Sequence, residues 1–213
     1  MLAITKTAGL SGICGMEVTV EASAERGLPA YHVIGLGDTA VKESAERVRG
    51  AILNSGFAYP KGRITVNLSP AWVRKSGSHY DLAIAAAILA TQGLFSEEKL
   101  SGKAFLGELK LNGEVQGVRG VLPMMTGLCG KATEVYLAES NRKEGSLAAK
   151  ESGTRVVAVK NLRQMVAMLR GEEEKIFYAV EREADFTEQV EKEEFTVPDF
   201  ADVKGQQAAK EAI

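Results

Sequence analysis

The sequence is poor in cysteine, histidine and aromatic residues. Its 213 residues include two cysteines, Cys14 and Cys129, and two histidines, His32 and His79, while aromatic residues make up 6%. Two cysteines without paired spacing exclude a disulfide framework and are typical of a cytoplasmic protein. Neither histidine stands at a metal-ligand spacing, so no metal site is predicted. No stretch approaches the ~18 uncharged apolar residues of a membrane-spanning helix, and no signal peptide precedes the first strand, so we expect no membrane contact.

Motifs for nucleotide and acyl chemistry are also missing. No stretch matches the phosphate-binding pattern G-x-x-x-x-G-K-[ST], so this chain is expected to carry no nucleotide cofactor of its own. Gly35-Leu36-Gly37 is only a G-x-G, which suits a turn from strand to helix. A Ser-His-Asp triad would lack the G-x-S-x-G turn that presents the serine.

Charge divides the chain near Gly171. Residues 1–170 carry 21 basic and 15 acidic side chains, a net of +6, whereas residues 171–213 carry 5 basic and 13 acidic ones, a net of −8. Such an asymmetry predicts a folded body over 1–170 followed by an acidic linker over 171–198.

Hydrophobic periodicity predicts a mixed α/β (α+β) body with helices packed on one sheet. Asp38 can cap a helix over 39–55, Ser78 and Asp81 have the spacing of a capping box, and the following helix is apolar on all sides and should be buried. Asn112-Gly113 predicts the turn of a hairpin that spans 103–118. The remaining expected strands cover 17–21, 30–35, 63–68, 134–138 and 155–159, and the remaining helices cover 122–131, 142–151 and 162–169.

Seven basic residues flank the helix over 39–55 and the strand over 63–68. If they meet in space, they form a positive patch that can neutralise phosphates, which makes nucleic acid a candidate partner. A plain solvated face is the alternative, because Glu43 and Arg47 form a compensating i,i+4 pair. The candidates are Lys42, Arg47, Arg49, Lys61, Arg63, Arg74 and Lys75.

Several sequence blocks occur in the order of a known family. They are 34–44, 46–49, 54–56, 64–70, 75–77, 81–85, 107–109 and 118–123. Through them, about residues 1–170 resemble the N-terminal domain of the magnesium-chelatase-like AAA+ ATPases of bacteria, the ComM/YifB family. Gly37 stands where the family usually has proline.

The last fifteen residues carry a second resemblance. Residues 199–213 look like the entry into the AAA+ core of that family, where Val203, Gly205 and Gln206 would border the adenine pocket. The phosphate-binding loop would follow beyond Ile213. The resemblance therefore implies a fragment without a cofactor of its own, in a full-length protein that binds ATP and Mg²⁺.

The resemblance also implies a fold. The N-terminal domains of this family are similar to the Lon protease domain and the second domain of ribosomal protein S5, a sandwich of helices on a mixed sheet. Lon cleaves peptides with a Ser-Lys dyad. The resemblance places His79 at the serine position and Met124 at the lysine position. A thioether accepts no proton, so the fragment is expected to have no catalytic residues of this type.

The family further implies a partner and a process. Its members are implicated in DNA branch migration as homo-hexameric ATP-driven rings, and the N-terminal domain would contribute subunit contacts and touch DNA. Two alternatives stay open. One is a protein-interaction module of the same ATPase without DNA contact, and the other is a Lon-type hydrolase with a displaced nucleophile, Ser76 or Ser78 near Lys75.

Overall fold

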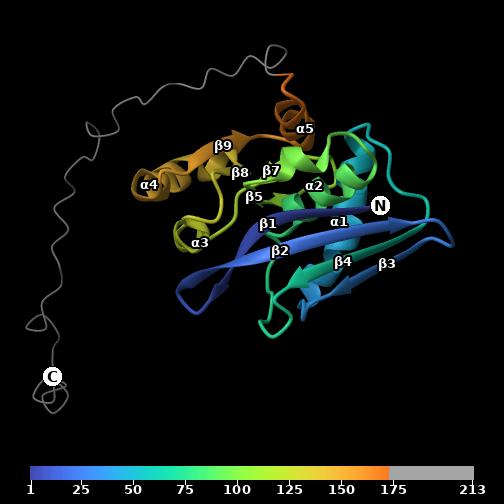
Figure 1. Cartoon of the computed structure of the whole chain (residues 1–213), viewed down its shortest axis with the longest axis horizontal. Helices are drawn as coiled ribbons and strands as arrows, with labels where there is room; N and C mark the ends of the chain where they lie inside the picture. The colour runs from blue at the N-terminus through green and yellow to red at the C-terminus, as the bar shows by residue number, and fades with distance from the viewer. Residues whose placement is uncertain (173–213) are drawn as a thin grey trace, which may run out of the picture. The chain divides into compact units, whose positions relative to one another are not determined.

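A seven-stranded mixed sheet forms the centre of the computed structural model, which describes residues 1–172 (Figure 1). The order is β3-β4-β2-β1-β5-β8-β9, in which β2 runs antiparallel to both β1 and β4, and the other neighbours are parallel. A separate two-stranded ladder joins β6 to β7. The strands are β1 (Leu2–Ser11), β2 (Cys14–Glu25), β3 (Ala30–Ile34), β4 (Arg63–Ser69), β5 (Lys103–Leu106), β6 (Glu108–Leu109), β7 (Val115–Gln116), β8 (Glu134–Ala138) and β9 (Arg155–Val159).

Helices cover both faces of the sheet. Alternate residues of one strand point to opposite faces. Phe105 accordingly belongs to the buried cluster that includes residues of α1, α2 and α5, whereas its neighbour Leu106 belongs to the cluster that includes residues of α3 and α4. The two buried clusters therefore lie on opposite sides of the strands, and the expected mixed α/β fold is confirmed. The helices are α1 (Thr39–Asn54), α2 (Asp81–Thr91), α3 (Val121–Leu128), α4 (Arg142–Ser152) and α5 (Leu162–Arg170), with short 3₁₀ turns at Glu97–Leu100 and Glu139–Asn141.

Local signals locate α1 and α2 correctly. The side chain of Asp38 accepts a hydrogen bond from the Val41 N–H at 2.9 Å and thus caps α1, as predicted. Gly56, with φ +82°, follows the end of the helix in the left-handed conformation that glycine tolerates. Every residue of α2 is buried, as its uniformly apolar sequence predicts.

The expected hairpin over 103–118 is partly wrong. Residues 103–106 belong to the central sheet as β5, and only Glu108–Leu109 pairs with Val115–Gln116 around the Asn112-Gly113 turn. The chain bends at Gly107 because its carbonyl oxygen accepts the N–H of Leu82, in the first turn of α2, at 3.1 Å. A contact with a distant helix therefore divides what looks like one long strand.

The first hairpin is longer than predicted. β1 and β2 pair from Leu2 and Ser23 at one end to Ser11 and Cys14 at the other. The sequence indicated β structure over the first 35 residues, but within 1–25 it gave bounds only for a strand over 17–21. The body predicted over 1–170 falls within the described residues. From residue 173 onward, the predicted linker over 171–198 and the segment over 199–213 lie outside them, so these boundaries stay predictions.

Candidate functional site

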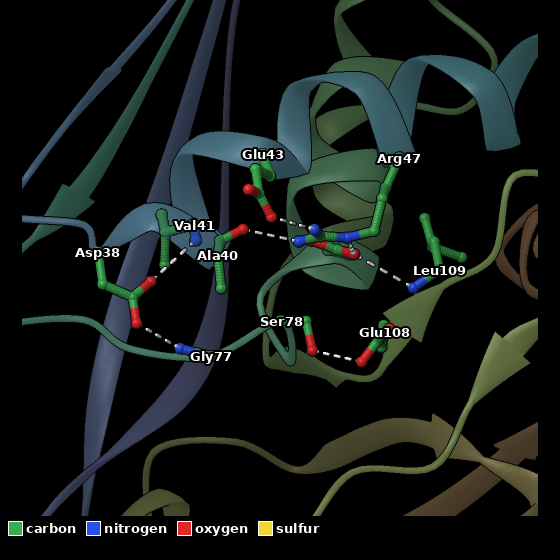
Figure 2. Close-up of polar contacts among 10 residues, drawn as sticks. Asp38, Ala40, Val41, Glu43, Arg47, Gly77, Ser78, Glu108 and Leu109 are labelled. Carbon is green, nitrogen blue, oxygen red and sulfur yellow. Dashed lines mark hydrogen bonds and ion pairs between the residues drawn. The ribbon is translucent and has the colours of Figure 1, made fainter.

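The start of α1 is tied to the loop that connects β4 to α2. One oxygen of the Asp38 carboxylate caps the helix, while the other accepts the N–H of Gly77 at 3.1 Å (Figure 2). The Asp38 N–H in turn donates to the carbonyl oxygen of Lys75 at 2.9 Å. One side chain therefore fixes two segments that lie almost forty residues apart.

Lys75 is enclosed within this loop. Its side chain is fully buried, and its ammonium donates a hydrogen bond to the carbonyl oxygen of Pro70. Burial lowers the pKa of Lys75. The sequence predicted that Lys75 belongs to a positive surface patch. In the structure Lys75 is buried, so its ammonium is not placed to reach a phosphate. Residues 70–76, which we call the Trp72 loop, instead expose Trp72, of which 81% is accessible to solvent.

Arg47 is also not the free surface cation that the helical pattern indicated. Its Nε lies 2.7 Å from Oδ2 of Asp81, and its Nη2 lies 3.1 Å from Oδ1. Nη2 also donates to the carbonyl oxygen of Ala40 at 2.7 Å (Figure 2). The expected Glu43–Arg47 pair is present at 3.9 Å. The hydrogen bond to Asp81 raises the pKa of Arg47. Burial raises the pKa of Asp81 to about 6, although Arg47 lowers it.

The predicted capping box at the start of α2 does not form. The Ser78 hydroxyl donates instead to a carboxylate oxygen of Glu108 (Figure 2), and no side chain caps α2. Asp81 accepts the N–H of Leu109 at 3.3 Å in addition to Arg47. Within the described residues no hydrogen bond joins Lys75 to Ser76 or Ser78, so the geometry gives no support to a displaced Ser-Lys dyad.

The two positions equated with the Lon dyad are both buried. His79 is 7% exposed beside the ring of Tyr80, and Met124 is 1% exposed in the cluster between α3 and the sheet. Burial lowers the pKa of His79 to about 4, although the backbone of Ala8 and the charge of Asp38 raise it. The imidazole is therefore neutral at pH 7. Its equivalence to the Lon serine stays a prediction.

The structure separates the five remaining basic candidates into groups. Lys42 lies in the first turn of α1, and Arg74 lies in the Trp72 loop. Arg49 is seven residues further along α1, about 10 Å away along the helix axis. There it shares the wall of a pocket with Lys61. Arg63 precedes Ile64 of the pocket wall, so alternation directs its side chain to the opposite face of the sheet.

These five side chains carry unpaired charge. Within residues 1–172, no carboxylate lies within 4.0 Å of a charged nitrogen of any of them. All five are exposed at the surface. Among the seven candidates, Arg49 and Lys61 are the two that line the same concave surface. The five are Lys42, Arg49, Lys61, Arg63 and Arg74.

This concave surface, which we call the Tyr59 pocket, is a cavity of about 570 Å³ between α1, β3 and the loop before β4. Arg49, Lys61 and Glu46 supply its charged groups. Tyr59 is half-buried, and burial raises its pKa to about 12, although Arg49 lowers it. Most of the wall is apolar or aromatic and includes Pro29, Tyr31, Leu53, Tyr59, Pro60 and Ile64.

Sequence reasoning missed the two tyrosines of the pocket and the exposed tryptophan. Tyr31 was noted only as a member of the predicted strand over 30–35, and Tyr59 falls between the predicted elements. The sequence Tyr59-Pro60-Lys61 beside a basic helix was the available signal, because it places an aromatic ring next to a cation. Only the fold shows that α1 brings Arg49 to the same place.

Some predicted features cannot be located. Val203, Gly205 and Gln206 lie outside the described residues, so the predicted border of an adenine pocket is not described. Within residues 1–172 no cluster of three or more His, Cys, Asp or Glu side chains could hold a metal ion. In the same residues no helix has the length and apolar character needed to cross a bilayer.

Comparison with known proteins gives the family. The sequence profile of the family described as subunit ChlI of Mg-chelatase matches residues 20–141. YifB of Escherichia coli, an uncharacterised protein, is 34% identical over 212 residues, which cover 100% of this chain and 40% of YifB. The competence protein ComM of Haemophilus influenzae matches with the same identity and coverage. An uncharacterised protein of Mycobacterium tuberculosis is 42% identical over 163 residues, which cover 75% of this chain and 31% of that protein.

The matches agree with the resemblance noted in the sequence. The chain spans 40% of the length of YifB and ComM, so activities of those whole proteins do not transfer to it directly. The profile match covers more than half of the chain and extends from β2 to the 3₁₀ turn before α4. The chain belongs to the Mg-chelatase-like family that contains YifB and ComM.

Proposed function

We propose that this chain is a non-catalytic N-terminal part of a Mg-chelatase-like AAA+ ATPase and that it contacts DNA in a ring-shaped branch-migration motor. The observation that supports DNA contact is the pair Arg49 and Lys61, two exposed cations without carboxylate partners on one concave surface. Unpaired cations can displace the counterions of a phosphate backbone, which is the main source of affinity in such complexes.

The rest of the proposed protein supplies what this fragment lacks. YifB and ComM are longer than this chain, which leaves room for an ATPase core that binds ATP and Mg²⁺. Assembly into a homo-hexameric ring is part of the same proposal, and so is a location in the cytoplasm. The name of ComM, a competence protein, supports a role in handling DNA.

A salt titration tests DNA contact. Fluorescence anisotropy of a labelled single-stranded oligonucleotide, measured with the 213-residue chain, gives the apparent affinity at several salt concentrations. Each phosphate contact with a single strand contributes about −0.7 to the slope of log K against log salt. Changing Arg49 and Lys61 together to Gln should therefore make the slope shallower by about 1.4. The matched control is Lys143→Gln, which removes an exposed cation on α4 outside the seven candidates and should leave the slope unchanged. Binding that does not weaken as salt rises would rule the proposal out.

The second candidate function is a protein-interaction module, and the Trp72 loop favours it. Trp72 and Leu36 are exposed by 81% and 61%, and Leu36 adopts a positive φ of +57°. Tryptophan is enriched in the energetically dominant parts of protein interfaces. Trp72→Ser should weaken capture of a protein partner or of a second subunit, with no effect on the salt slope for DNA. If Trp72→Ser changes DNA binding instead, this second function loses its basis.

A further inference from the structure

The Tyr59 pocket has the volume and the aromatic lining to hold one planar ring. Its volume of about 570 Å³ falls within the range of small-molecule sites, roughly 300–1,000 Å³. Two tyrosine rings and two prolines form much of its wall. Unstacked bases of single-stranded nucleic acid bind to such aromatic surfaces, because every base presents a flat face.

We propose that the Tyr59 pocket holds one unstacked base of single-stranded DNA against Tyr59, while Arg49 and Lys61 bind the phosphates on either side of that nucleotide. This inference rests on the proposed function, because it names the form of DNA and the part of the nucleotide that the pocket recognises. It differs from backbone contact alone, which needs no cavity and no aromatic ring.

The charges around the pocket suit an anionic strand. Arg49 and Lys61 are free of ion pairs within the described residues, and Glu46 is the acidic side chain of the wall. A carboxylate among cations does not bind phosphate, but it can accept a hydrogen bond from an N–H group of a base, which thymine supplies at N3. The Tyr59 hydroxyl stays neutral near pH 7, because its pKa lies at about 12. It therefore adds no negative charge next to the backbone.

A second hollow continues the path from the pocket. It has a volume of about 380 Å³ and shares Pro60, Lys61 and Gly62 with the Tyr59 pocket. Arg26, Glu25 and Gln92 also line it. Lys61 thus stands between two adjoining concave surfaces, which is where the phosphate between two consecutive nucleotides would lie.

The decisive experiment compares two oligonucleotides of equal charge. One is a fluorescein-labelled strand of twelve thymidines, and the other has the same backbone with abasic residues in place of the six central nucleotides. Anisotropy titrations use the 213-residue chain at a fixed low salt concentration. If the pocket holds a base, the intact strand should bind about fivefold to a hundredfold more tightly than the abasic one.

Variants assign the difference to the pocket. Tyr59→Ala should remove most of the preference for the intact strand, whereas Tyr59→Phe, which keeps the ring, should retain it. Arg49→Gln should weaken both strands by a similar factor, because both carry the same phosphates. Thermal unfolding of each variant shows whether it folds, and the comparison of the two strands on the unaltered chain needs no variant at all.

The outcomes separate this inference from the function on which it rests. Equal, salt-dependent affinity for both strands overturns the base pocket and leaves DNA contact in place. If neither strand binds in a salt-dependent manner, both the base pocket and DNA contact are overturned. A preference for the intact strand that survives Tyr59→Ala also overturns the inference, because the base is then bound elsewhere.

Discussion

Arg47 and Asp81 form a bidentate ion pair that joins the middle of α1 to the first residue of α2. Asp81 is 1% exposed, and its carboxylate also accepts the N–H of Leu109 beside the bend at Gly107. The guanidinium extends to the Ala40 carbonyl oxygen at the start of α1. The pair therefore fixes the relative positions of the two helices that pack together on one face of the sheet.

Removing the cation from this pair should destabilise the fold. Arg47→Leu leaves the Asp81 carboxylate buried without a charged partner, and breaking a buried pair in this way costs about 3–5 kcal/mol. The Arg47 side chain is 21% exposed, so we expect the lower end, about 3 kcal/mol. Urea unfolding followed by circular dichroism measures this change.

Arg49→Leu is the matched control for that substitution. Arg49 lies two residues further along the same helix, is exposed and makes no ion pair within residues 1–172. Its replacement should change the free energy of unfolding by less than about 0.5 kcal/mol. Equal effects of the two substitutions would mean that the pair adds nothing specific to stability.

His79 should make stability depend on pH. Burial lowers the pKa of His79 to about 4, whereas an unfolded histidine titrates near 6.5. As the pH falls below 6.5 the unfolded chain takes up the proton first, so the contribution of His79, fully present above pH 6.5, is lost towards pH 4. Between pH 7 and pH 5 the loss should be about 2 kcal/mol, part of the roughly 3 kcal/mol that the whole shift from 6.5 to about 4 represents. Denaturant unfolding at pH 7.0, 6.0 and 5.0 measures it.

The variant His79→Gln isolates this contribution. Asp81 acts in the opposite sense, because its raised pKa of about 6 favours the folded state as the pH falls. The difference in unfolding free energy between parent and variant is therefore the informative quantity, and it should shrink as the pH falls. His32→Gln, at an exposed position on β3, should retain the loss of unfolding free energy that His79 causes as the pH falls. A difference that is the same at all three pH values would contradict a buried neutral His79.

Local sequence patterns predicted most of the helices and strands correctly. Where a prediction was wrong, a contact with a residue distant in the sequence was the reason. The strands at 134–138 and 155–159 and the cap at Asp38 follow from periodicity and from one side chain, and the structure has them. Asp81 had the spacing of a capping residue, but Arg47, which is 34 residues earlier in the chain, holds its carboxylate instead. No local window contains both residues.

The same reason limits the prediction of the site. Arg49, Lys61 and Arg63 were all recognised as cations. Arg63 is separated from the other two because its side chain points to the face of β4 opposite to the pocket, and the sequence does not show on which face the pocket lies. The burial of Lys75 depends on the Trp72 loop closing around it, which no charge pattern indicates. Tyr31 and Tyr59 belong to the pocket only because β3 and the loop before β4 lie beside α1.

Close packing of α3 on β2 gives a prediction about a glycine. A Cβ at Gly15 would lie 1.8 Å from the carbonyl oxygen of Pro123 and 2.9 Å from the Cα of Met124, both backbone atoms of α3. Gly15→Ala must therefore push the helix away from the sheet, and we expect a loss of about 3 kcal/mol or more in the free energy of unfolding. Gly130→Ala is the control, because a Cβ at Gly130 would have no atom within 4 Å. This substitution costs only the backbone strain of alanine at a φ of +69°, about 1–2 kcal/mol in the free energy of unfolding. Thermal unfolding that shifts equally for both variants would argue against this contact.

The adjacent residues Arg74 and Lys75 should respond very differently to charge reversal. Lys75→Glu places a carboxylate inside the Trp72 loop beside the Pro70 carbonyl oxygen, so we expect a loss of about 3 kcal/mol or more. Arg74→Glu alters an exposed side chain and should change stability by less than about 0.5 kcal/mol. Circular dichroism is the suitable probe, because Trp72 is already 81% exposed in the folded chain. If both variants are as stable as the parent, Lys75 must reach solvent, and it would then join the cations available to DNA.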